Sequence, residues 1–161
     1  MTVRIENLQR HTGSIEDLSV THFDLWGPLT SRNTLEEYQR LLERAVAADG
    51  LPSTLVAEEN GAILGSVNVL DSDLPIRSDL TPWLAQLFVF PEYRHQGIGS
   101  LLVDAAISEA RRLSHSAIYL YTSGSLPKYY EGLGWSRLDE VEYLDKLRVI
   151  MAYNIETRFE A

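Results

Sequence analysis

The stretch EYRHQGIGSLL, residues 92–102, places two glycines one residue apart at the start of a predicted helix. Glycine destabilises a helix interior by about 1 kcal/mol relative to alanine, so two of them here need a reason. The first turn of a helix has main-chain N–H groups without intrahelical partners, and the helix dipole is positive there. Gly97 and Gly99 would leave those groups open to an anion, and Arg94 adds a fixed positive charge. The stretch therefore predicts a phosphate-binding turn, although a plain flexible turn has the same local sequence.

The residues on either side of this turn predict a strand before it and a helix after it. Residues 83–90, WLAQLFVF, are almost continuously apolar, as in a strand that is covered on both faces. From Gly97 onward, apolar residues recur at helical spacing as far as Leu113. A second apolar strand follows over residues 117–122, and then a short helix within residues 126–135.

The remaining segments complete an α+β domain that spans residues 1–161. Two earlier helices are predicted by capping boxes, one at Ser14 with Asp17 and one at Thr34 with Glu37. Further strands are predicted over residues 3–8, in two runs on either side of the turn pair Asn60-Gly61, and over residues 136–142 and 147–154. The order of elements indicates one mixed sheet.

The composition limits the classes of function. A net charge of −9 argues against a nucleic-acid partner, which needs clustered Lys and Arg; it suits cationic partners such as amines, although solubility alone accounts for it equally well. The absence of cysteine excludes thiolate sites, and the four histidines lack metal-ligand spacing, so no metal is expected. We find no signal peptide and no apolar run long enough for a membrane span, so a cytoplasmic protein without a membrane partner is expected.

Two common phosphate motifs do not fit the glycine turn. The dinucleotide fingerprint needs a third glycine, and Leu102 stands at that position, which disfavours a nucleotide-binding oxidoreductase. The P-loop needs Gly-Lys-Ser/Thr, and none follows.

The segment over residues 84–110 instead resembles the acetyl-CoA-binding segment of the GNAT superfamily of N-acetyltransferases. Its motif, Arg/Gln-x-x-Gly-x-Gly/Ala, is satisfied by Arg94, Gly97 and Gly99. Residues 119–135, YLYTSGSLPKYYEGLGW, are similar to the family's second landmark, a strand and a short helix ending in Tyr-x-x-x-Gly-Phe/Trp. The order of elements also agrees over nearly the whole chain.

This resemblance implies a fold and a way of holding acetyl-CoA. The fold would be a three-layer, largely antiparallel sheet of about seven strands with helices on both faces. The fourth and fifth strands, residues 83–90 and 117–122, would splay around the pantetheine arm. Pantetheine would pair with main-chain groups of Leu87, Phe88 and Val89. The pyrophosphate would lie against N–H groups of Arg94, His95, Gln96, Gly97, Ile98, Gly99 and Ser100.

The resemblance also implies a reaction, in which an acceptor amine attacks acetyl-CoA directly in a ternary complex. Tyr130 stands at the family's general-acid position and would protonate the leaving thiolate, with Tyr129 as the less favoured choice. The acceptor would be a small-molecule or peptide amine, such as a polyamine, an aminoglycoside or an amino-acid derivative. Trp26 and Trp83 are candidate acceptor-site residues, and Trp26 fits the core equally.

The chain departs from the family pattern at two places. Ser123 stands where many members have asparagine, which puts that contact with acetyl-CoA in doubt. The strand before the glycines offers no acidic base, only Gln86, so a base would act through water, be unnecessary, or come from Asp71, Asp73, Asp79 or Glu36. A catalytically inactive acyl-CoA-binding module is the alternative function, and a homodimer is expected because dimers are common in similar proteins.

Overall fold

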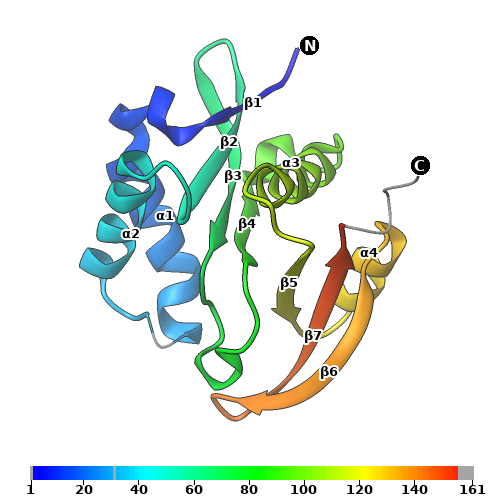
Figure 1. The fold of residues 1–161 in the computed structure, drawn as a ribbon. Coiled ribbons are helices and arrows are strands. Elements are labelled where there is room, and N and C mark those ends of the chain that lie inside the picture. Colours follow the sequence, from blue (N-terminus) through cyan, green and yellow to red (C-terminus); the bar gives the residue numbers. More distant parts are fainter. Residues whose placement is uncertain (1, 31, 156–161) are drawn as a thin grey trace.

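A single sheet of seven strands forms the middle layer of the fold (Figure 1). The computed structural model describes residues 2–30 and 32–155. The strand order is β1-β2-β3-β4-β5-β7-β6, and only β4 and β5 pair in parallel. The strands are β1 (Arg4–Asn7), β2 (Ser53–Glu59), β3 (Ala62–Leu70), β4 (Trp83–Val89), β5 (Ala117–Thr122), β6 (Ser136–Tyr143) and β7 (Lys146–Asn154). The predicted largely antiparallel sheet is confirmed.

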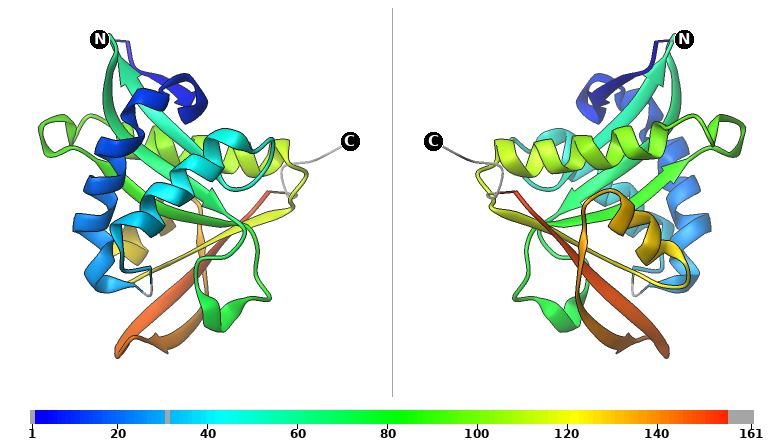
Figure 2. Two further views of the ribbon diagram at one scale, coloured as in Figure 1. Left: turned by 90° about the vertical axis from the view of Figure 1, so that its left-hand side faces the viewer. Right: turned by 90° about the vertical axis from the view of Figure 1, so that its right-hand side faces the viewer.

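Helices cover both faces of this sheet (Figure 2). One face carries α1 (Ile15–Trp26) and α2 (Leu35–Ala47), and the other carries α3 (Ile98–Arg112) and α4 (Leu126–Gly132). On the α3 side, apolar helix residues pack against the sheet in one large cluster that includes Leu102 and Val67, both fully buried. In the part of the chain that the structure describes, no helix is both long and apolar enough to cross a bilayer.

The two predicted capping boxes have different outcomes. The Thr34 hydroxyl accepts from the Glu37 N–H at 3.2 Å, and the Glu37 carboxylate accepts from the Thr34 N–H at 3.1 Å, so the box that starts α2 is confirmed. The box at Ser14 is wrong, since its side chain makes no cap hydrogen bond. Ser14 ends a 3-10 turn and already has helical dihedrals (φ −94°, ψ −2°), whereas an N-cap needs extended backbone to point its oxygen at the helix.

The sheet splits between β4 and β5. The register pairs these strands only at Trp83 and Tyr119, where the Tyr119 N–H donates to the Pro82 carbonyl at 3.0 Å. Beyond this point the two strands have no register pair, although β5 stays paired with β7 on its other edge, and β4 bends at Gln86, whose φ of +56° marks a bulge in its register with β3. The predicted splay of the fourth and fifth strands is therefore confirmed, and it opens the middle of the sheet.

Candidate active site

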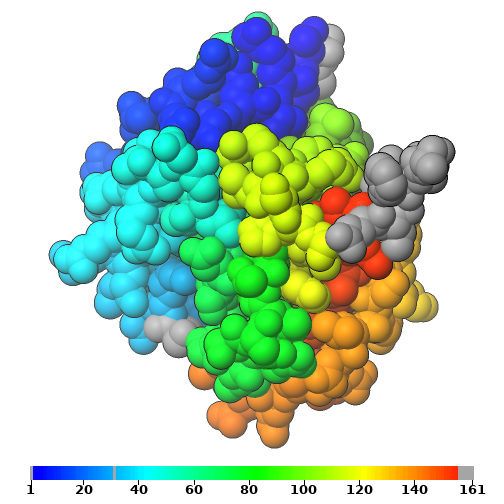
Figure 3. All heavy atoms as spheres, viewed as in Figure 1, coloured from blue at the N-terminus to red at the C-terminus, as the bar shows by residue number. Residues whose placement is uncertain are grey.

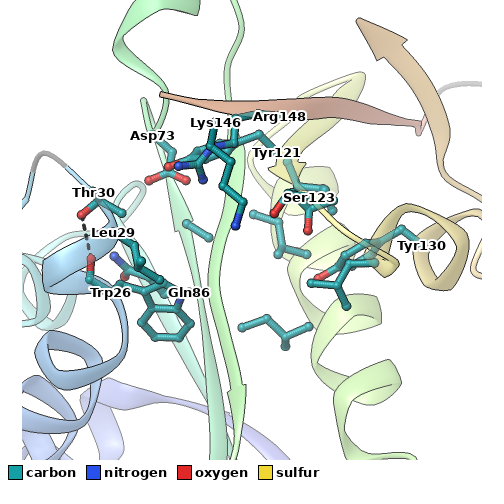
Figure 4. A pocket seen from close by; sticks show the side chains of 16 residues that line it. Trp26, Leu29, Thr30, Asp73, Gln86, Tyr121, Ser123, Tyr130, Lys146 and Arg148 are labelled. Carbon is teal, nitrogen blue, oxygen red and sulfur yellow. Dashed lines mark hydrogen bonds between the residues drawn. The ribbon is translucent and has the colours of Figure 1, made fainter. Parts of the chain in front are cut away.

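A cavity of about 300 Å³ lies where β4 and β5 diverge (Figure 4). Its lining comes from both faces of the sheet, because alternate residues of a strand point to opposite sides. Leu84 and Leu120 belong to the core cluster under α3, whereas Ala85 packs with α2 on the opposite face. The cavity is therefore lined from both layers of helices at the split in the sheet.

The glycine turn lies between the end of β4 and the start of α3. The first bond of the helix runs from the Leu101 N–H to the Gly97 carbonyl at 3.2 Å. The preceding N–H groups, those of Ile98, Gly99 and Ser100, consequently have no partner within the helix. An anion placed there would also meet the positive end of the helix dipole.

The two glycines serve different purposes. Gly97 has a φ of +82°, and a Cβ at this residue would meet nothing within 4 Å, so the residue supplies a left-handed backbone conformation rather than space. His95 is also left-handed, with a φ of +65°. A Cβ at Gly99 would lie 3.3 Å from the hydroxyl of Tyr129, so this glycine permits close packing against α4. Left-handed residues near the start of a helix help to form an anion-binding concavity of N–H groups.

Arg94 ties this turn to the end of β4. Its Nε donates to the Val89 carbonyl at 2.8 Å, and its guanidinium carbon lies 5.9 Å from the centre of the Phe88 ring. The side chain is otherwise exposed, and no other acceptor among the described residues contacts the guanidinium group. Its remaining N–H donors stay open next to the N-terminus of α3.

The main chain of β4 presents alternate residues to the split. The Phe90 N–H donates to the Leu64 carbonyl of β3 at 2.9 Å, and the Phe88 carbonyl lies so close to Gly65 of β3 that a Cβ there would clash. Main-chain groups of a strand alternate between its two edges, so those of Leu87 and Val89 face the split. The main-chain groups of Phe88 point toward β3, so they do not face the split.

The structure separates the two tyrosine candidates. Tyr130 lines the cavity and is only 7% exposed, and burial together with the neighbouring Tyr129 raises the pKa of its hydroxyl above its usual range. The phenol is therefore protonated at neutral pH. Tyr129 is 41% exposed and lies outside the lining, with its hydroxyl against Gly99.

Among the acids that were candidates for a base, Asp73 lines the cavity. Its side chain is 13% exposed and lies 3.8 Å from the Arg32 guanidinium. Burial raises the pKa of Asp73 to about 6, and Arg32 opposes that shift. The other three candidates lie outside the lining: Asp71, Asp79 and Glu36.

The loop that carries Asp73 packs against the β6–β7 hairpin (Figure 3). Arg77 in this loop forms ion pairs with Asp139 of β6 at 2.9 Å and with Asp79 at 3.0 Å. Burial of Leu74 beside Ile150 of β7 adds an apolar anchor. These contacts fix the position of Asp73 at the rim of the cavity.

The two tryptophans have different outcomes. Trp26, the last residue of α1, lines the cavity and packs edge-on against His22, with ring centres 5.4 Å apart. The expectation for Trp83 is corrected, because Trp83 is fully buried and its Nε1 donates to the Leu80 carbonyl at 2.7 Å. An acceptor therefore cannot contact Trp83 without unpacking the core.

Several lining residues come from segments that the sequence analysis did not single out. Ser123 and Gln86 were named from the family pattern, and both line the cavity. Lys146 and Arg148 of β7 line it as well, and the ammonium group of Lys146 points into the cavity (Figure 4). The predicted strand over residues 147–154 contained Arg148 and began one residue after Lys146. In the structure the strand begins at Lys146, and the i, i+2 spacing then places both charges on one face of the sheet.

Comparison with known proteins places this arrangement in a family. Residues 10–135 match the profile of the acetyltransferase (GNAT) family. No curated protein matches the sequence at a significant level.

Solved structures of similar fold cover nearly the whole chain. An aminoglycoside 6'-N-acetyltransferase complexed with coenzyme A is 18% identical with a TM-score of 0.72, over 94% of this chain and 97% of that one. A variant of spermidine N-acetyltransferase from Vibrio cholerae is 16% identical with a TM-score of 0.73, over 98% and 96%. A GNAT acetyltransferase from Streptococcus pneumoniae is 21% identical with a TM-score of 0.69, over 96% and 99%. At these identities the structures show a shared fold. Because the family profile spans most of the chain, this protein belongs to the GNAT family of acetyltransferases.

Proposed function

We propose that this protein transfers the acetyl group of acetyl-CoA to a primary amine of a small molecule, by direct attack in a ternary complex. The observation that carries the proposal is the cavity at the split between β4 and β5, with the buried hydroxyl of Tyr130 in its wall. The structural neighbours include enzymes named for acetylating aminoglycosides and spermidine, which supports an amine as the acceptor.

The residues around the split fit acetyl-CoA. The N–H groups at the start of α3 have no helix partner and would hold the pyrophosphate, with Arg94 as an added charge, as expected for the whole turn over residues 94–100. The main-chain groups of Leu87 and Val89 have no strand opposite them in the described chain, and would pair with the pantetheine amides. Ser123 lines the cavity and would contact the cosubstrate near its reactive end.

Acetyl-CoA supplies the acetyl group in this reaction, in which a C–N bond forms and a C–S bond breaks, so the amine loses a proton and the sulfur gains one. Tyr130 holds a proton at the cavity wall, since burial raises the pKa of its hydroxyl, and it can donate this proton to the leaving sulfur as the C–S bond breaks. Asp73 lies on the acceptor side and is ionised above about pH 6, so it can take the amine proton directly or through water. Leu84, Leu87 and Leu120 add apolar side chains to the cavity lining.

The test is a thiol-release assay with acetyl-CoA and a panel of primary amines. The Tyr130→Phe variant is expected to lose roughly 100-fold or more in kcat, because general-acid catalysis is worth about that much. Tyr129→Phe is the matched control and should keep activity near that of the wild type. Equal rates for wild type and Tyr130→Phe, with acetyl transfer rate-limiting, would remove Tyr130 from the mechanism. Calorimetric binding of acetyl-CoA without turnover of any amine would instead indicate an inactive acyl-CoA-binding module.

A further inference from the structure

The acceptor side of the cavity carries more positive than negative charge. Lys146 and Arg148 alternate with Leu147 along β7, so both side chains lie on the sheet face that carries α1 and α2. Neither forms an ion pair with another described residue. Asp73 is the only acid among the described residues of the lining, and it already faces Arg32 at 3.8 Å. This excess of positive charge in the cavity contrasts with the net charge of −9 of the whole chain.

Arg148 is held in a fixed position. Its guanidinium carbon lies 5.7 Å from the ring centre of Tyr121 and 5.8 Å from that of Tyr143. Its Nε donates to the Tyr143 carbonyl at 3.3 Å, which leaves the terminal nitrogens free for a ligand. A planar guanidinium fork fixed in this way suits a carboxylate, which it can bind with two parallel hydrogen bonds.

Lys146, on the same strand, adds a second positive charge at this end of the cavity. It lies opposite Tyr143 in the β6–β7 register, at the end of the hairpin, and its ammonium group points into the cavity (Figure 4). A polycationic acceptor would place its further ammonium groups next to Lys146 and Arg148, and like charges at short range disfavour binding. An acceptor with an anionic group would be attracted instead.

One wall of the cavity carries two apolar side chains. Trp26 at the end of α1 and Leu29 in the following 3-10 turn line it, across from Tyr130 and Ser123 (Figure 4). A small molecule with its anion at Arg148 could therefore bury an apolar side chain against Trp26. The volume of about 300 Å³ is at the lower end of the range for ligand pockets, which suits a small acceptor.

We infer that the acceptor is an amine that also carries a carboxylate, namely an amino acid or a close derivative, and that Arg148 and Lys146 bind this carboxylate. The inference rests on the proposed function and narrows its substrate class. It separates this protein from the neighbours named for aminoglycosides and spermidine, whose acceptors are polycations.

The first experiment compares amines that differ only in the carboxylate. Methionine and phenylalanine are assayed against methioninamide and phenylalaninamide, with spermidine and kanamycin as polycations. We expect kcat/KM to be roughly 10- to 100-fold higher for each acid than for its amide, the range given by one hydrogen-bonded charge pair. The amides have the less basic amine, so a preference for the acids cannot come from amine ionisation. Equal or better use of the amides, or a preference for spermidine or kanamycin, would overturn the inference.

The second experiment assigns the preference to residues. Lys146→Gln and Arg148→Gln are each expected to bring the acid-to-amide ratio of kcat/KM close to one, mainly through a higher KM for the acids. Arg148→Lys should restore part of the ratio. Arg111→Gln is the control, because Arg111 is an exposed arginine on α3 outside the lining. If acids and amides lose activity equally, the two cations serve folding and the inference fails.

The outcomes distinguish this inference from the proposed function. Transfer to amines without a carboxylate, and not to amino acids, leaves an acetyltransferase standing and removes the inference alone. Failure to acetylate any amine removes both. Lys146 is exposed and its side chain bonds no described residue, so Lys146→Gln is expected to fold even if Arg148→Gln does not.

Discussion

At the scale of single residues, Asp73 has a pKa of about 6 because it is buried at the rim of the cavity. If Asp73 takes the amine proton, kcat/KM should rise with pH through about 6 as the carboxylate forms. Asp73→Asn should lose this limb and be slower at pH 7 to 8. A pH profile of kcat/KM for both proteins between pH 5 and 9 tests this. A limb that persists in Asp73→Asn would assign it to another group.

The same group affects stability. Its pKa is higher in the folded protein than the usual value of 3.8 for an aspartate, so its stabilising contribution is present below that value and is lost as the pH rises through about 6. Asp73→Asn should therefore be more stable than wild type at pH 8, by on the order of 1–3 kcal/mol. The gain should shrink as the pH falls below 6. Urea unfolding at pH 8 and pH 5 measures it, and an equal gain at both would indicate a cause other than ionisation.

Gly97 has a left-handed backbone conformation, which residues with a side chain rarely adopt. Its φ is +82°, so Gly97→Ala should destabilise the protein by about 1 kcal/mol and weaken coenzyme A binding by distorting the turn. Gly13→Ala is the matched control, because that exposed glycine has open space around it and needs no left-handed conformation. Urea unfolding and calorimetry with coenzyme A measure the two effects. Equal behaviour of the two variants would contradict the role given to Gly97.

At the scale of elements, the start of α2 depends on a reciprocal pair of hydrogen bonds. Thr34→Ala removes the side-chain half of the capping box and should lower the free energy of unfolding by about 1 kcal/mol. The KM for acetyl-CoA should stay unchanged, since α2 lies outside the cavity lining. Ser14→Ala should cost little, because the Ser14 hydroxyl makes no cap bond. Urea unfolding of both variants compares the two helix starts.

An element could be predicted from the sequence where its cause lies in residues that are close together in the chain. The Asn60-Gly61 turn could be predicted because both residues must have positive φ, and they do, at +53° and +85°. The α3 turn and Tyr130 follow from short spacings within one segment. The bulge at Gln86 could not be predicted, since it involves a contact across the sheet: the Asn68 side-chain amide of β3 donates to the side-chain Oε1 of Gln86.

At the scale of the whole molecule, the site draws on segments far apart in the sequence. Asp73 and Arg148 meet at one cavity because the 71–82 loop packs against the β6–β7 hairpin, and no local pattern contains that contact. The net charge of −9 gave no hint of a cationic end inside the cavity. A homodimer and a cytoplasmic location stay predictions.

The split also makes stability depend on ligand. The β1–β4 half and the β5–β7 half of the sheet join at a single register pair, Trp83 and Tyr119, so a molecule bound between them would contact both halves. Coenzyme A at about 100 times its Kd should add about 2.7 kcal/mol, which is roughly 5–10 °C in Tm for a domain of this size. Thermal unfolding with and without coenzyme A measures this. Adenosine 3',5'-bisphosphate, which lacks the pantetheine arm, should bind more weakly and give a smaller shift at the same concentration; an equal shift at equal concentration would place the stabilisation at the phosphate turn alone.

The unpaired side of β4 has a cost for the empty protein. A sheet normally confines main-chain groups without a strand partner to its outer edges, but here those of Leu87 and Val89 lie in the interior of the sheet, and Arg94 bonds only the Val89 carbonyl. Any extended polypeptide, including a misfolded copy of the same chain, finds a template there for adding a strand. Bound cosubstrate would thus cover this edge of β4 and reduce aggregation. In a cell short of coenzyme A, the protein would be in the form that associates most readily.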